Sequence, residues 1–318
     1  MTDFDTAQWT HPSVILVATD LNDLDRLMPF AFEQAGETGA RLILLHVLTA
    51  GEGINVDAGG MPYYDTSAAF DFAAKTLERW RSQAIQKHML CDVLVREGNA
   101  AQQIVSSIRQ FQAGRILLGT RSRGKLSKLL LGSVAEQVLR SVNLPVITVG
   151  PEAHLAVGNS DDEKVVLHAI TLRETSRSSA VLACQIASSQ NARLVLLHVL
   201  PSPEGTARTN LPTHLEATAL RELEILAEET RRQVHDRSPH IDLRVVHGHP
   251  AIEILATASE MRASLIILGA TQRSALQNLT RDRTIYRVLA HARCPVLTLR
   301  EAGSALPLAS AERVAFLH

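Results

Sequence analysis

The chain has 318 residues, of which 46% are hydrophobic and 20% are charged, and its formal net charge at pH 7 is -1. This composition is typical of a globular protein that is long enough for two domains, and it disfavours a disordered chain. The near-neutral charge disfavours binding to nucleic acid or to an anionic membrane, both of which select for basic surfaces. The aromatic content of 4% also disfavours a surface on which nucleic-acid bases stack.

The sequence shows no targeting or redox motif. Its first residues, MTDFDTAQWTHPS, contain no basic region followed by an apolar one, so we expect no secretory signal. No apolar run reaches the roughly 18–20 residues that a membrane-spanning helix needs. Cys91, Cys184 and Cys294 are scattered and form no C-x-x-C pair, so we interpret them as buried thiols. These features predict a cytoplasmic protein in a reducing compartment.

Short apolar runs alternate with longer amphipathic stretches through the first half of the chain. The runs, which we predict to be strands, are Ser13–Thr19, Arg41–Val47, Cys91–Glu97, Arg115–Thr120 and Pro145–Val149. The stretches with helical spacing, which we predict to be helices, are Leu24–Gly39, Thr66–Met89, Ala100–Phe111 and Ser133–Val142. Continuous apolar runs indicate strands that are covered on both faces. The alternation therefore predicts an α/β fold with a parallel, doubly wound, Rossmann-like sheet.

The second half of the chain repeats the first. RLILLHVL at Arg41–Leu48 recurs as RLVLLHVL at Arg193–Leu200, and RILLGT recurs as LIILGA, so that Gly119 corresponds to Gly269. A segment rich in small and charged residues separates the two copies, which is typical of a linker. We therefore predict a first domain at residues 1–150, a linker at 151–163, a second domain at 164–302 and a C-terminal tail at 303–318.

The stretch GTRSRGKLSKLLLGS, Gly119–Ser133, follows the fourth predicted strand. Two of its glycines and Lys125 have the G-x-x-x-x-G-K spacing of a Walker-type phosphate loop, but Leu126 stands where that loop needs a Ser or Thr to bind magnesium. A Walker-type loop should also follow the first strand of its domain. The stretch ends in Gly132-Ser133 at the start of a predicted helix, where backbone N–H groups and the helix dipole favour an anion.

Two of these features are expected to meet at one edge of the sheet. Ligands of doubly wound sheets bind outside the carboxyl ends of the strands, where the strand order reverses. Asp20 ends the first predicted strand and Gly119 ends the fourth, so both should lie there. We expect Asp20 to present an unpaired carboxylate to this crevice.

With its five strands, its two copies and this loop after the fourth strand, the sequence resembles the universal stress protein family in its tandem two-domain form, over nearly the whole chain. Nucleotide-binding members of that family carry G-x2-G-x9-G-[ST] after the fourth strand and an Asp at the end of the first. In this sequence Gly119 matches the first glycine, Ser122 replaces the second, and Gly132-Ser133 is the closing pair. The resemblance implies two five-stranded sheets of order 3-2-1-4-5 that pack as a pseudo-dimer through their fifth strands.

The resemblance also implies an ATP site, with or without magnesium. The implied nucleotide-binding residues are Ala18, Asp20, Val47, Gly119, Ser122, Arg123, Lys125, Gly132, Ser133 and Val134. Asp20 would accept from a ribose hydroxyl or the adenine amino group, and Val47 would contact the base. Ser122 would cost roughly 1–2 kcal/mol if the family glycine at this position has a positive φ.

The second half departs further from the family pattern. Of the motif residues of the first half, the second half retains only the first glycine, as Gly269. The other motif positions hold Thr171, Gln272 and the pair Asp282-Arg283. We therefore expect the site in the second domain to be degenerate.

Structural explanations stay open for several of these residues. Gly132 could simply make a strand-to-helix turn, and Ser133 could cap its helix. The arginines and lysines of the loop could bind phosphate or only solvate the loop. His46 and His198 lie inside apolar runs, where histidines more often belong to the core than to a ligand site.

Together with the resemblance, the sequence predicts a cytoplasmic stress-response protein that binds ATP in its first domain. We expect a regulatory or binding protein with no catalytic residues, and at most slow ATP hydrolysis, because no nucleophile–base pair, metal cluster or nucleophile elbow is apparent. The alternative is a nucleotide-free interaction scaffold that works through its edge strands or through residues 49–65. An adenine nucleotide is the expected partner, a homodimer is compatible with the sequence, and neither nucleic acid nor a membrane is expected.

Overall fold

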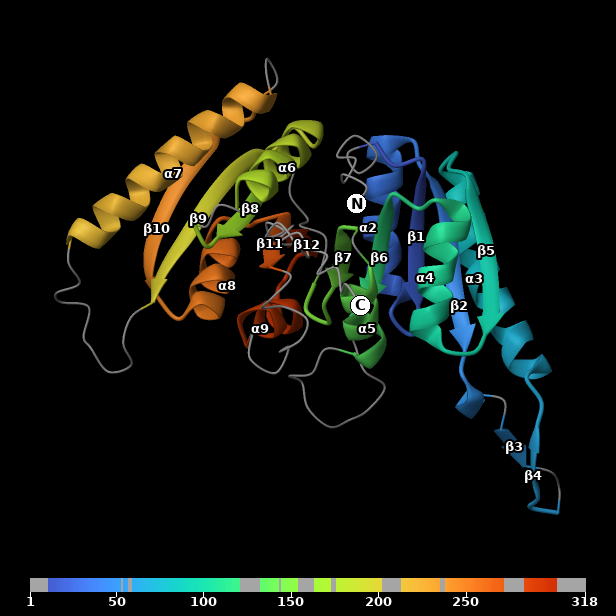
Figure 1. The fold of residues 1–318 in the computed structure, drawn as a ribbon. Coiled ribbons are helices and arrows are strands. Elements are labelled where there is room, and N and C mark those ends of the chain that lie inside the picture. The colour runs from blue at the N-terminus through green and yellow to red at the C-terminus, as the bar shows by residue number, and fades with distance from the viewer. Residues whose placement is uncertain are drawn as a thin grey trace, which may run out of the picture.

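Ten strands, five from each half, form the centre of the fold (Figure 1). The structure is a computed structural model that describes residues 11–52, 54–56, 59–120, 132–142, 144–153, 163–172, 176–201, 213–234, 238–271 and 283–301. The first half contributes β1 (Val14–Thr19), β2 (Arg41–Leu48), β5 (Cys91–Glu97), β6 (Arg115–Gly119) and β7 (Val146–Val149). The second half contributes β8 (Val165–Ile170), β9 (Arg193–Pro201), β10 (Ile241–Gly248), β11 (Leu265–Thr271) and β12 (Val296–Glu301).

These strands form one continuous sheet in the order β10-β9-β8-β11-β12-β7-β6-β1-β2-β5 (Figure 1). Within each half all neighbours are parallel and the strand order is 3-2-1-4-5. The halves join where β7 and β12 pair antiparallel, with Ile147 opposite Leu297. The prediction of two doubly wound sheets that pack as a pseudo-dimer through their fifth strands is confirmed. Because the seam is antiparallel, the carboxyl ends of the strands point in opposite directions in the two halves.

Helices cover both faces of the sheet. One face is covered by α2 (Leu24–Thr38), α3 (Ser67–Gln86), α6 (Ser176–Ser189) and α7 (Thr213–Val234), and the other by α4 (Ala100–Phe111), α5 (Ser133–Ser141), α8 (Pro250–Glu260) and α9 (Arg283–His291). Ile15 and Val17 belong to one buried cluster and Leu16 to the other, so β1 is buried on both faces. This two-sided burial is what continuous apolar runs predict. None of the described helices is both long enough and apolar enough to cross a membrane.

The predicted strands and helices of the first half agree with the structure to within three residues at each end. Local signals set several of these ends. Helix α2 stops where Gly39 adopts a φ of 71°, a left-handed conformation that favours glycine. Asn99 precedes helix α4 and caps it, because its side-chain oxygen accepts a hydrogen bond from the Gln102 N–H at 3.0 Å.

Residues 49–65, to which the sequence analysis assigned no secondary structure, contain a small hairpin. After the 3-10 helix η1 (Ala50–Glu52), strands β3 (Ile54–Val56) and β4 (Pro62–Tyr64) pair antiparallel. Figure 1 shows the hairpin extending away from the large sheet, between β2 and α3. Each strand has three residues, which is too short to show a recognisable alternation of apolar and polar side chains.

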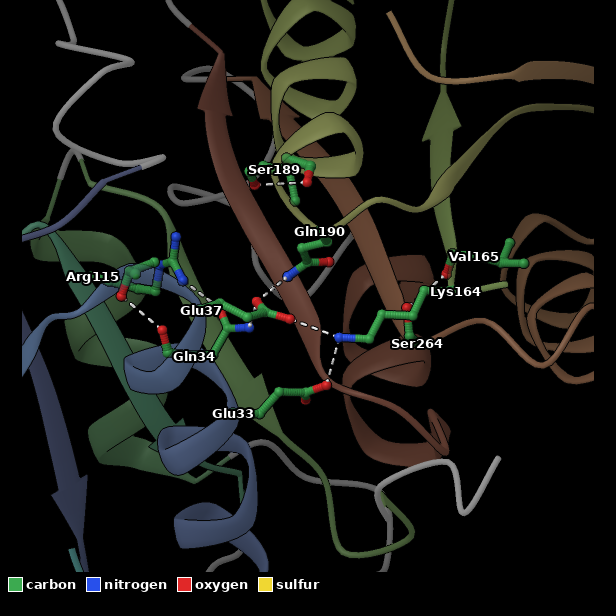
Figure 2. Close-up of polar contacts among 11 residues, drawn as sticks. Glu33, Gln34, Glu37, Arg115, Lys164, Val165, Ser189, Gln190 and Ser264 are labelled. Carbon is green, nitrogen blue, oxygen red and sulfur yellow. Dashed lines mark hydrogen bonds and ion pairs between the residues drawn. The ribbon is translucent and has the colours of Figure 1, made fainter. Parts of the chain in front are cut away.

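Ion pairs join helix α2 to the second half beside the seam. The Lys164 ammonium donates to Glu33 Oε1 at 2.9 Å and to Glu37 Oε1 at 2.6 Å (Figure 2). The Gln190 amide also donates to Glu37, at 3.4 Å. These groups are only partly exposed, with 38% of the Lys164 side chain and 23% of the Glu37 side chain accessible. The contacts therefore hold α2 against the second domain in addition to the strand pairing.

A close backbone approach adds to the same interface. Gly150 directly follows β7, and a Cβ at this position would lie 3.0 Å from the carbonyl oxygen of Leu289 in α9. Such a contact is tighter than side chains normally tolerate, and neither backbone could move without disturbing its own element. Glycine at residue 150 therefore lets the end of β7 pack directly on α9.

We expect Lys164→Ala to lower the free energy of unfolding by about 1 kcal/mol at low ionic strength, because two carboxylates of α2 then face each other without their cation. The loss should shrink at high salt, which screens half-exposed charges. Urea unfolding of the full chain at two salt concentrations measures this effect. Lys75→Ala, which removes an exposed lysine from α3, is the control. Equal losses for the two variants would show that the α2 contact does not stabilise the fold.

Candidate functional site

A cavity of about 280 Å³ lies where β1, β2 and β6 end. Seven of the ten predicted site residues line it, namely Ala18, Asp20, Val47, Gly119, Gly132, Ser133 and Val134. The other three, Ser122, Arg123 and Lys125, lie outside the described residues. The cavity is at the point where the strand order reverses, because β1 has β2 on one side and β6 on the other.

The first turn of helix α5 forms one wall of the cavity. Ser133, Val134 and Ala135 line it, and among the described residues no side-chain hydrogen bond caps the helix at Gly132, which directly precedes it. By contrast, the Asn99 side chain caps α4. The first N–H groups of a helix have no partner within the helix, and the helix dipole makes this end positive. This wall therefore has the character of an anion-binding site.

Gly132 is held against the end of β6. Its N–H donates to the carbonyl oxygen of Thr120 at 3.1 Å, and its own carbonyl oxygen accepts from the Glu136 N–H at 2.9 Å. Its φ of -58° and ψ of 138° are open to any residue. The backbone therefore does not require glycine here, and the physical advantage of this residue is the space that it leaves in the cavity wall.

Asp20 follows β1 and lines the cavity, but its carboxylate is not unpaired as expected. Its Oδ1 accepts from the Asn22 N–H at 2.9 Å, and the Asn22 amide donates to the Asp20 carbonyl oxygen at 3.1 Å. This local turn orients the side chain. A carboxylate has about four acceptor positions, so this one bond leaves Asp20 able to accept from a ligand hydroxyl or amino group.

The two histidines inside apolar runs have equivalent structural roles. His46 is 3% exposed, and its Nδ1 lies 2.9 Å from the Thr19 carbonyl oxygen at the end of β1. His198 repeats this contact in the second half, with Nδ1 2.8 Å from the Ile170 carbonyl oxygen. Because a carbonyl oxygen only accepts, each Nδ1 carries the proton. Each histidine thus ties the second strand of its domain to the end of the first.

Asp23, which the sequence analysis did not select, places a buried carboxyl group in the cavity wall. The residue is 5% exposed, and its Oδ1 accepts from the Thr19 hydroxyl at 2.5 Å. A Cβ at position 119 would lie 1.9 Å from its Oδ2, so Gly119 is needed here to make room for this carboxyl group. Burial raises the pKa of Asp23 to about 6; the Thr19 hydrogen bond partly offsets this.

Little of the corresponding crevice in the second half falls within the described residues. Thr171 follows β8 at the position of Asp20 and is exposed, and Gly269 lies in β11. Gln272 and Asp282 lie outside the described residues. In the described part of the chain, no group of three or more His, Cys, Asp or Glu side chains could bind a metal ion.

The raised pKa of Asp23 predicts a pH-dependent stability. The folded protein holds this proton more tightly than the unfolded chain, whose carboxyl has a pKa near 3.8. The stability that this group contributes is therefore complete below about pH 4 and is lost as the pH rises through about 6. Relative to the wild type, Asp23→Asn should gain about 2–3 kcal/mol of unfolding free energy between pH 4 and pH 7.5, because Asn does not titrate.

Urea unfolding at the two pH values measures this gain. Asp25→Asn removes an exposed carboxyl group from the same helical turn and should show no such gain. A difference between Asp23→Asn and the wild type that does not change with pH would contradict the burial of an ionisable Asp23.

Three comparisons place this chain among known proteins. A curated universal stress protein of Mycobacterium bovis is 26% identical over 192 residues, which cover 60% of this chain and 63% of that protein, so the match spans less than two thirds of the relative. The crystal structure of a universal stress protein from Archaeoglobus fulgidus covers 91% of this chain and 98% of its own at 18% identity and a TM-score of 0.67. A universal stress protein crystallised in complex with cAMP covers 44% of this chain and 96% of its own at 20% identity and a TM-score of 0.35.

The family match covers both halves separately. Residues 13–150 and residues 156–300 each match the universal stress protein family. The two matches include all ten strands of the large sheet except the last residue of β12. The chain therefore belongs to the universal stress protein family, with two family domains in tandem.

Proposed function

We propose that the first domain binds ATP in the cavity between β1, β2 and β6, and that the protein acts as a nucleotide-binding regulator in the cytoplasm. The observation that carries this proposal is the start of α5, where no side chain of the described residues caps the helix and which opens onto the same 280 Å³ cavity as Asp20. The positive start of the helix suits the phosphates of a nucleotide, and the carboxylate of Asp20 suits a hydroxyl or amino group of its nucleoside. The family membership supports a role in the response to stress.

The phosphate end of the ligand is assigned to the start of α5. The N–H groups of Ser133 and Val134 belong to the first turn of the helix, and the Ser133 hydroxyl adds a further donor. Phosphate groups bind well at such sites because the N–H groups and the dipole both favour negative charge. From the sequence alone, we also assign Ser122, Arg123 and Lys125 to the phosphates, with or without a magnesium ion.

The nucleoside end is assigned to the ends of β1 and β2. Asp20 would accept a hydrogen bond from a ribose hydroxyl or from the adenine amino group. Ala18, Val47 and Leu118 provide apolar surface on which a base could pack. Ligand cavities generally combine apolar walls with a few polar groups, and the volume here is close to the lower end of the usual range of about 300–1,000 Å³. A cavity of this size suits a nucleoside, with the phosphates extending along the start of α5.

We propose that the second domain does not bind ATP. Thr171 lacks the carboxylate that Asp20 supplies, and the sequence places Asp282 before α9 where Gly132 precedes α5. A carboxylate at the start of a helix can cap the N–H groups that would otherwise bind phosphate. The proposed functional domains are residues 1–150, which bind nucleotide, and residues 164–302, which are degenerate. We assign no catalytic residue and expect at most slow ATP hydrolysis.

An interaction scaffold is the second candidate, because the β3–β4 hairpin carries exposed apolar surface at its turn. Met61 is 67% exposed there, and Phe72 on the neighbouring helix α3 is 64% exposed. In this case both domains would be free of nucleotide, and a protein partner would bind the hairpin or an edge strand.

Gly132→Val should abolish detectable ATP binding, because two methyl groups would occupy the cavity wall at the phosphate end. Valine can adopt the backbone angles of Gly132 without strain, so the variant should still fold. Calorimetry of the full chain with ATP measures the affinity. Gly51→Val is the control, because no atom lies within 4 Å of a Cβ at residue 51. ATP binding that survives in Gly132→Val would refute the assigned site.

The number of ATP molecules bound per chain tests the assignment of the two domains. We expect calorimetry to give one site per chain, because the sequence has Asp20 and Gly132 in the first domain but Thr171 and Asp282 at the corresponding positions of the second. Two sites of similar affinity would contradict a degenerate second domain. No binding at millimolar ATP would favour the scaffold.

A further inference from the structure

We propose that the buried Asp23 carboxylate opposes anion binding in this cavity, so that the affinity for a nucleotide increases when Asp23 is protonated. The inference rests on the proposed function and adds a form of regulation to it. The first domain would then bind its nucleotide more tightly in acid than at neutral pH.

The geometry brings the Asp23 carboxyl group close to the proposed phosphate site. Its Oδ2 packs on Gly119, the last residue of β6. The next residue, Thr120, accepts the hydrogen bond from the Gly132 N–H at 3.1 Å, and Gly132 directly precedes α5. Asp23 contacts Gly119, and α5 begins beside the residue that is hydrogen-bonded to Thr120, so both line the cavity close to the end of β6. An anion at α5 and an ionised Asp23 would be neighbours in one cavity.

The carboxyl group of Asp23 is buried, and its surroundings favour the protonated form. The residue is 5% exposed, and within the described part of the chain its side chain accepts a hydrogen bond from a neutral donor, the Thr19 hydroxyl. Thr19 in turn accepts from the Leu21 N–H at 2.9 Å, which fixes the hydroxyl and therefore the position of the carboxyl group. Burial raises the pKa of Asp23 to about 6.

The charged and titratable groups around Asp23 come from the elements that pack against it. Asp20, at the end of β1, raises the pKa of Asp23 further, and Arg26, on α2, lowers it. His46, on β2, lines the same cavity. Helix α5 carries Glu136 in its first turn, where it pairs with Arg140 at 2.6 Å. Within the described residues, none of these groups forms an ion pair with the Asp23 carboxyl group.

The expected size of the effect follows from the charge repulsion between two anions in a partly dry cavity. At a separation of several ångströms and an effective dielectric constant near 20, one ionised carboxylate should weaken the binding of a phosphate group about tenfold after screening by salt. The coupling is reciprocal, so a bound nucleotide should raise the pKa of Asp23 by about one unit.

Calorimetry of the full-length wild type and of Asp23→Asn with ATP at pH 5.0 and pH 7.5 tests this inference. We expect the variant to bind ATP about tenfold more tightly than the wild type at pH 7.5, and equally tightly at pH 5.0. The ratio of the two dissociation constants at each pH cancels the titration of ATP itself. Asp25→Asn, in the same turn of α2 but exposed, should match the wild type at both pH values.

Each other outcome overturns a defined part of the account. If ATP binds the wild type but the ratio is the same at both pH values, or if Asp23→Asn binds more weakly at pH 7.5, the role of Asp23 is refuted and the proposed function stands. If ATP does not bind the wild type at either pH, the proposed function and this inference both fail.

A second measurement needs no variant and so cannot be confused by a folding defect. The pKa of the Asp23 carboxyl group can be measured by nuclear magnetic resonance, from the chemical shift of its carboxyl carbon, in the wild type with and without saturating ATP. A rise of about one unit with ATP is expected from the reciprocal coupling. An unchanged pKa in the presence of bound ATP would overturn the inference.

Discussion

The antiparallel pair of β7 and β12 is the contact on which the rest of the structure depends. Both strands are apolar fifth strands that would otherwise be exposed edges, and Ile147 and Leu297 are 3% and 0% exposed at their junction. The pairing makes one sheet from two domains and gives the helices of both halves common faces. It also directs the carboxyl ends of the two sets of strands in opposite directions. Each domain therefore has its own crevice, and one crevice can change its residues without disturbing the other.

The first of these crevices combines groups with opposite preferences. The start of α5 favours an anion, whereas the buried Asp23 is itself an anion when ionised. A buried carboxyl group with a raised pKa costs stability at neutral pH, and such costs are typical of functional sites. Gly119 is the residue that makes the combination sterically possible, because any side chain there would displace the carboxyl group. In our proposal the cavity binds a nucleotide, and the protonation of Asp23 adjusts how tightly it does so.

Most of the fold could be predicted from the sequence because its signals are local and occur twice. Apolar runs, helical spacing and the repeated RLILLHVL and RLVLLHVL segments identify the strands and the two domains, and Gly39 marks the end of a helix through its own conformation. The contacts that were missed join residues far apart in the chain or depend on side-chain direction. The Lys164 ion pairs cross between domains, and an aspartate at the start of a helix normally caps it, whereas Asp23 turns toward Gly119. The turn around Asp20 required knowledge of how Asn22 folds back on it.

Native mass spectrometry of the intact chain, before and after incubation with ATP, tests the central claim most directly. The claim is that one cavity, at the carboxyl ends of β1, β2 and β6, is a nucleotide site. The account predicts a species heavier by one adenine nucleotide per chain, which is lost in Gly132→Val and retained in Gly51→Val. A spectrum that shows only the unliganded mass, or a bound nucleotide that persists in Gly132→Val, would contradict it.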